Sequence, residues 1–242
     1  NSYAGVTNKL LAKNAAKICV AYEGMEKFFP KEKIILTGNP VRQDFLEVAP
    51  KAEEAYKFFN FDPSKKTLLI IGGSLGARTI NQSVLKGLPQ LKAAGIQVLW
   101  QTGKYYFENM KQQAAPYIDE NLLVTDFVKR MDYAYAIADL VISRAGASSI
   151  SELCLLGKPS ILVPSPNVAE DHQTKNAMAL ASRDAAVMIT DADAPAKLAD
   201  TAVGLIADGQ KLSAISANAK AMAQLDSADR IATEILSLVT KE

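Results

Sequence analysis

The sequence predicts an α/β fold with a doubly wound, Rossmann-like parallel sheet, and three features support this. Short apolar runs alternate with amphipathic, helix-like runs along most of the 242 residues. The apolar runs are rich in Ile, Val and Leu, which is typical of strands buried on both faces. A glycine-rich turn, Gly72-Gly73-Ser74-Leu75-Gly76, follows the first strand of the main domain and opens a helix.

Hydrophobic periodicity gives the expected elements in chain order. Strands are expected at 33–37, 67–71, 96–100, 122–124, 140–142, 160–163 and 186–189. Helices are expected at 77–86, 105–113, 131–137, 149–155 and 171–182, and then at 194–207, 211–224 and 228–239. Near the start, residues 6–20 have the pattern of one amphipathic helix with Lys9, Lys13 and Lys17 on one face.

The chain divides into a short first segment, a linker and one main domain. Thr37-Gly38-Asn39-Pro40-Val41-Arg42 reads as extended and turn-rich, because a residue before proline disfavours helix. We therefore expect residues 1–36 to belong to a different domain and 37–64 to form the linker and the domain start. Residues 65–225 are expected to form the Rossmann-like domain, and 226–242 a C-terminal helix that packs back toward the domain to which residues 1–36 belong.

Composition excludes several classes of function. The net charge is +1 and aromatic residues make up 7%, so we expect no nucleic-acid partner. His172 is the only histidine, which argues against a histidine-based zinc site, and no metal or other cofactor is expected. No apolar run approaches the ~20 residues of a membrane span.

The most informative stretch is 143–152, Ser-Arg-Ala-Gly-Ala-Ser-Ser-Ile-Ser-Glu. An apolar strand breaks there at small residues and restarts as a helix, which leaves unpaired N–H groups at the positive end of a helix dipole. Such a helix start binds phosphate. Glu152 would repel an anion but suits the hydroxyls of a ribose, so the stretch predicts a nucleotide or nucleotide-sugar site.

Other candidates follow other strands, where ligands bind in open α/β sheets. Ser74 is placed to donate to a phosphate oxygen, and the Phe127-Val128 loop to hold a flat base, although core packing explains Val128 equally well. Arg144 suits either a phosphate contact or a structural role. Ser148 and Ser149 can cap the helix expected at 149–155, a role that does not exclude a ligand contact.

His172 and Gln173 start a helix after the prolines that follow another strand, where they can bond sugar hydroxyls; a simple cap or surface role remains open for His172. No catalytic triad and no acid/base pair of carboxylates can be argued. The residues thus describe a binding site without an evident catalyst.

The motifs together resemble the MurG family of glycosyltransferases. The matching segments are NSYAGVTNKLLAK (1–13), TGNPVR (37–42), IIGGSLGARTINQ (70–82), WQTG (100–103), DFVKRM (126–131), ADLVISRAGASSISE (138–152) and EDHQTKNA (170–177). They run in the family's order from end to end of the chain.

The resemblance implies the C-terminal, donor-binding half of a two-domain GT-B enzyme. Such enzymes transfer N-acetylglucosamine (GlcNAc) from UDP-GlcNAc to undecaprenyl-pyrophosphoryl-muramoyl-pentapeptide, converting lipid I to lipid II in peptidoglycan synthesis. It implies an inverting, metal-independent hexosyltransferase at the cytoplasmic face of the bacterial inner membrane. The acceptor site and catalytic base are expected in an N-terminal domain that this chain largely lacks, so the chain alone is expected to be soluble and inactive.

By the same resemblance, UDP-GlcNAc is expected to contact Asn1, Arg42, Ser74, Val128, Ala147, Ser148, Ser149, Glu152, His172 and Gln173. Glu152 would accept from the ribose, the Val128 backbone would hold uracil, and Ser74 would face the diphosphate. Three alternatives stay open: another GT-B UDP-sugar enzyme such as an epimerase, a non-catalytic nucleotide-sugar-binding subunit, and a dinucleotide oxidoreductase.

Overall fold

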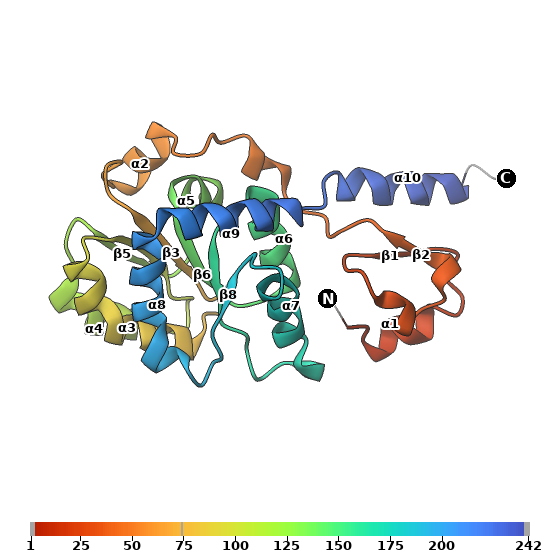
Figure 1. Cartoon of the computed structure of the whole chain (residues 1–242), viewed down its shortest axis with the longest axis horizontal. Coiled ribbons are helices and arrows are strands. Elements are labelled where there is room, and N and C mark those ends of the chain that lie inside the picture. The colour runs from red at the N-terminus through yellow and green to blue at the C-terminus, as the bar shows by residue number, and fades with distance from the viewer. Residues whose placement is uncertain (1–2, 74, 240–242) are drawn as a thin grey trace.

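A computed structural model describes residues 3–73 and 75–239, and its main domain is a parallel six-stranded sheet between two layers of helices (Figure 1). The strands lie in the order β5-β4-β3-β6-β7-β8, and every pair is parallel. Their bounds are β3 Thr67–Ile71, β4 Gln97–Gln101, β5 Leu122–Thr125, β6 Leu140–Ser143, β7 Ser160–Leu162 and β8 Val187–Met188. The predicted α/β class and all six strands of the main sheet are confirmed.

The helices cover both faces of this sheet. One face carries α2 (Glu53–Phe59), α5 (Met131–Ile137), α6 (Ala147–Leu156) and α7 (His172–Ala181). The other carries α3 (Arg78–Ala93), α4 (Phe107–Ala114) and α8 (Ala194–Ala207), and α9 (Gly209–Ala221) contributes to both cores. Residues Leu68 and Ile70 of β3 enter one core while Leu69 and Ile71 enter the other, as the two-residue period of a strand requires.

The first segment forms a small unit beside the main domain (Figure 1). Its strands β1 (Ile18–Val20) and β2 (Ile34–Leu36) pair in parallel. The helix expected over 6–20 is wrong: α1 spans only Val6–Leu11, and the chain then turns and enters β1. Pairing of Ile18 with Ile34 overrides the local helical pattern, because strand partners distant in sequence outweigh weak propensity. Helix α2 is not among the helices expected from hydrophobic periodicity.

The linker and the last helix meet between the two parts. Gly38 has φ 83°, and a Cβ there would lie 2.4 Å from Gln224 Cβ and 2.5 Å from Ser227 Oγ, so only glycine fits. Helix α10 (Ser227–Val239) then leaves the main domain and reaches the first segment, where Glu234 pairs with Lys17 (Figure 1). Within residues 3–73 and 75–239, no helix combines the length and apolarity needed to cross a bilayer.

A lysine cluster lies where β6 begins, at the amino ends of the strands and opposite the strand ends that carry the glycine-rich turn. Lys158 Nζ donates to the Ala138 carbonyl at 3.0 Å, and Lys51 pairs with Asp139 at 2.8 Å. Burial, with a smaller effect from the charge of Lys51, lowers the pKa of Lys158 to about 8. The folded state therefore binds the Lys158 proton less tightly than the unfolded state does.

This difference predicts how stability depends on pH. Between about pH 8 and the usual lysine pKa, the unfolded chain carries the Lys158 proton and the folded chain does not, so stability rises with pH. The contribution is fully present above that window and is lost as pH falls through about 8. Relative to Lys158→Met, the unchanged chain should gain on the order of 1–2 kcal/mol of unfolding free energy between pH 7.5 and 9.5. Urea unfolding at several pH values measures this difference, and a pH-independent difference would contradict the account.

Candidate functional site

The topology opens a crevice at the carboxyl ends of the strands, between β3 and β6. The chain leaves β3 toward α3 on one face and leaves β6 toward α6 on the other, so the two exit loops diverge. This is the switch point at which open α/β sheets bind ligands. A cleft of about 770 Å³ lies there, and its walls include the following described residues: Gly72, Gly73, Gly76, Arg144, Gly146, Ser149, Ser165, Asn167, Gln173 and Asp191.

Helix α6 presents its N-terminus to this cleft. Gly146 is the residue before the helix, and no side chain of the described residues caps it. The serine caps expected at Ser148 and Ser149 are therefore wrong, because α6 begins at Ala147 and both serines lie within its first turn. The N–H groups of Ala147, Ser148 and Ser149 have no partner within the helix, so they are available to an anion.

The glycine-rich turn after β3 forms the opposite wall. Gly76 has φ 84°, and a Cβ on it would lie 2.1 Å from the Thr102 carbonyl oxygen. A Cβ on Gly103 would lie 2.2 Å from the Gly76 nitrogen. The turns after β3 and β4 therefore pack backbone to backbone, which requires glycine in both. Ser74, predicted to face phosphate, and Asn1, predicted to lie near the donor, fall outside the described residues.

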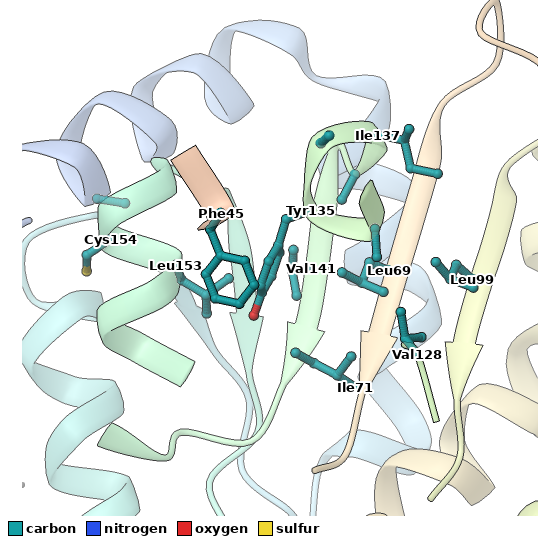
Figure 2. Packing of buried hydrophobic residues seen from close by; sticks show 14 of the residues in the cluster. Phe45, Leu69, Ile71, Leu99, Val128, Tyr135, Ile137, Val141, Leu153 and Cys154 are labelled. Atoms are coloured by element: carbon teal, nitrogen blue, oxygen red, sulfur yellow. The ribbon is translucent and has the colours of Figure 1, made fainter. Parts of the chain in front are cut away.

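Glu152 lies one turn along α6 and is held by α5. Tyr135 Oη donates to Glu152 Oε2 at 2.8 Å, and the Tyr135 ring packs edge-on against Phe45 at 5.4 Å (Figure 2). Burial raises the pKa of Glu152, while the Tyr135 hydroxyl and the Arg42 guanidinium oppose the rise. Burial and the Glu152 charge raise the pKa of Tyr135 well above its usual value, so Tyr135 remains a donor. Glu152 is thus fixed and retains free acceptor capacity on its carboxylate.

Arg42 reaches this neighbourhood from the linker. Its guanidinium pairs with Asp44 and lies 5.0 Å from the Phe45 ring, and its side chain is 63% exposed. Arg42 and Glu152 influence each other electrostatically, which places the linker arginine near the predicted ribose acceptor. Asn39, also in the linker, donates to Ser151 Oγ of α6 at 3.0 Å.

The predicted base-binding loop is secured by a residue that sequence reasoning missed. Val128 is 4% exposed, and its N–H donates to Gln101 Oε1 at 2.8 Å. The Gln101 amide also donates to the Gly73 carbonyl at 3.3 Å. Gln101 therefore joins the loop after β5 to the glycine-rich turn. The signal available in the sequence was a glutamine that ends an apolar strand, because a buried polar side chain needs a hydrogen-bond partner. Since the Val128 N–H is already bonded to Gln101, a base held at Val128 would bond to the Val128 carbonyl oxygen.

The loop after β7 supplies Gln173 and His172. Gln173 lies in the cleft wall, where its Oε1 accepts from the Ser165 N–H at 2.9 Å. His172 is the first residue of α7 and directly precedes Gln173 in the chain. The preceding Glu170 and Asp171 have φ 59° and 50°, a left-handed conformation that costs free energy in non-glycine residues. Strain of this kind concentrates at ligand sites.

The structure thus divides the predicted residues into two groups. Ser149 and Gln173 line the cleft, with Ala147 and Ser148 at the start of α6 beside it. Val128 and Glu152 belong to the side of the sheet covered by α5 and α6, where Tyr135, the partner of Glu152, packs against Phe45 (Figure 2). Within the part of the chain that the structure describes, no three His, Cys, Asp or Glu side chains gather as a metal site.

Comparison with known families decides which family this geometry represents. The glycosyltransferase family 28 C-terminal domain matches residues 67–231. The chain belongs to this family. The matched region includes all six strands of the main sheet and both walls of the cleft.

Curated relatives match over nearly the whole chain. It is 60% identical to a Parabacteroides distasonis protein named UDP-N-acetylglucosamine--N-acetylmuramyl-(pentapeptide) pyrophosphoryl-undecaprenol N-acetylglucosamine transferase, with 100% of the chain and 66% of the relative covered. It is 58% identical to a Bacteroides fragilis protein of the same name, with 98% of the chain and 63% of the relative covered. The chain therefore spans less than two thirds of these relatives' length.

Solved structures agree on the architecture. The crystal structure of Acinetobacter baumannii MurG superposes with a TM-score of 0.77 at 29% identity, over 98% of this chain and 65% of that one. The S. aureus MnaA–UDP structure superposes with a TM-score of 0.68 at 12% identity, over 98% of this chain and 65% of that one, and at this identity it supports the fold alone.

The contact between Tyr135 and Glu152 gives a testable prediction. Tyr135→Phe removes the donor that stabilises the charged carboxylate, so the pKa of Glu152 should rise further above its usual value. Carboxyl ¹³C chemical shifts followed through a pH titration measure this pKa. Tyr133→Phe, on the same helix and without a described contact to Glu152, is the matched control and should leave it unchanged. An unaltered Glu152 pKa in Tyr135→Phe would show that the hydroxyl does not hold the carboxylate.

Proposed function

We propose that this chain is the donor-binding part of a glycosyltransferase. The enzyme transfers GlcNAc from UDP-GlcNAc to undecaprenyl-pyrophosphoryl-N-acetylmuramyl-pentapeptide, the lipid I to lipid II step of peptidoglycan synthesis. The observation that carries the proposal is the uncapped start of α6 at the β3–β6 switch point, with Glu152 one turn away, in a chain 60% identical to a transferase of this name.

The donor is proposed to lie across the cleft in one direction. Uracil rests against the Val128 loop, and Glu152 accepts from the ribose hydroxyls. The diphosphate meets the N–H groups that begin α6 and the glycine-rich turn. The GlcNAc then approaches His172 and Gln173, where the Gln173 Nε2 group donates to no described residue.

This arrangement suits an inverting displacement at the sugar C1. As the bond to UDP breaks, negative charge grows on the departing phosphate. The α6 dipole and its free N–H groups are already aimed at that position, so they stabilise the charge without a metal ion. The acceptor site and the catalytic base are assigned to an N-terminal part of the enzyme beyond the donor half, to which residues 1–36 would belong.

The remaining assignments follow from this division. Residues 37–64 would serve as the interdomain linker and 226–242 as a helix returning to the N-terminal domain, in keeping with the Lys17–Glu234 pair. The complete enzyme would work on lipid I at the cytoplasmic face of the inner membrane, as a peripheral protein without a nucleic-acid partner. This chain alone would bind donor without turning it over.

Calorimetric titration with UDP-GlcNAc, UDP-glucose and NAD tests the donor site. Selective binding of UDP-GlcNAc is expected. Glu152→Ala should weaken it by roughly 1–3 kcal/mol, because the ribose hydroxyls lose their acceptor. Glu54→Ala, an exposed glutamate on α2, is the control and should bind as the unchanged chain does. Binding of NAD in preference to UDP-sugars, or an unchanged affinity in Glu152→Ala, would contradict the proposal.

A further inference from the structure

Arg144 occupies the point where several strand-end loops converge. It directly follows β6 and lies two residues before Gly146, the residue that precedes α6. Its Nη1 lies 3.1 Å from the Val163 carbonyl oxygen and 3.1 Å from that of Pro164, both just after β7. The same nitrogen lies 2.5 Å from Asp191 Oδ1, in the loop after β8.

Asp191 extends this contact to the other wall of the cleft. Its second oxygen, Oδ2, accepts from Thr79 Oγ1 at 2.7 Å, and Thr79 is the second residue of α3. One carboxylate thus connects the start of the helix after the glycine-rich turn with the arginine that precedes α6. The link spans the β3–β6 switch point, where no strand pairing joins the two exit loops.

The ion pair in this link is largely shielded from water. The side chains of Arg144 and Asp191 are 16% and 20% exposed, so their attraction is only partly screened by water. Both residues line the cleft. Alone, the Asp191 carboxylate would repel a bound diphosphate, and Arg144 cancels that charge.

We propose that Arg144, Asp191 and Thr79 form a positioning network that holds the N-termini of α3 and α6 at the separation a nucleoside diphosphate requires. The ligand class rests on the proposed function, but the mechanical link does not. In this network Arg144 acts through the loops it holds, and Asp191 is needed although its charge is unfavourable to the ligand.

A simple electrostatic role and a positioning role predict opposite changes in UDP affinity for the substitution Asp191→Asn. Asp191→Asn removes a negative charge from the cleft, so a purely electrostatic role, or a direct Arg144–phosphate contact, predicts tighter UDP binding. Positioning predicts weaker binding, because Arg144 loses its ion pair and the α3 link is weakened. Thr79→Val keeps the side-chain shape and all formal charges while removing only the donor to Asp191.

Titrations of this chain with UDP and uridine separate these outcomes. In Asp191→Asn and Thr79→Val, UDP affinity should fall about tenfold while uridine affinity stays unchanged, since only the diphosphate end is displaced. Thr190→Val is the matched control: its hydroxyl bonds Asp193, outside the network, so both affinities should stay as they were. Tighter UDP binding in Asp191→Asn, or equal losses for UDP and uridine, would overturn the proposal.

Hydrogen exchange on the ligand-free chain tests the network independently of the ligand. The Ile150 N–H closes the first turn of α6 on the Gly146 carbonyl at 3.0 Å. Thr79→Val should speed exchange of the Ile150 amide several-fold, although Thr79 belongs to α3, and Thr190→Val should not. Unchanged exchange at Ile150 would refute the mechanical link even if UDP binds. A chain that binds no UDP but shows this coupling would refute only the proposed function.

Discussion

The site depends on one topological constraint: β3 and β6 are neighbours in the sheet, but the chain leaves them toward opposite faces. Because the exit loops diverge, the cleft lies between them. The constraint also fixes the direction of α6, whose uncapped first turn faces the cleft. Donors for an anion are therefore supplied by the backbone and need no particular side chain.

Side chains then hold these backbone groups in place. Gln101 joins the Val128 loop to the glycine-rich turn, Tyr135 fixes Glu152, and the Arg144–Asp191 pair connects the loops after β6 and β8. Each of these polar groups is at least partly buried and has its partner within the domain, as buried polar groups require. The proposed site is therefore preorganised, which lowers the conformational entropy that ligand binding would have to overcome.

Much of this was predictable from the sequence because it is local. Short runs of sequence are enough to predict the strand β3, the glycine-rich turn after it and the break at 143–146. Strand β3 and helix α5 have the predicted bounds. Glu152 stands out in the sequence because an acid one turn into a helix predicted to bind phosphate needs a separate reason. The helix expected over 6–20 is wrong because residues 18–20 pair with β2, a strand that is distant in sequence.

The partners within the site were not predictable for the same reason. Tyr135 lies 17 residues from Glu152, and Asp191 lies 47 residues from Arg144, so no periodicity links them. The expected start of α6 is two residues late because serines usually cap helices, whereas here Gly146 precedes the first helical residue, Ala147, and no described side chain caps the helix. A local capping rule therefore did not decide where this helix starts.

The most direct test of the central claim is to map where UDP binds on this chain by amide chemical-shift changes in ¹H–¹⁵N spectra. The account predicts that the largest changes fall on residues 72–79, 126–130 and 144–152, at the carboxyl ends of β3, β5 and β6. Changes confined to the first segment or to the opposite edge of the sheet, near Lys158, would contradict it.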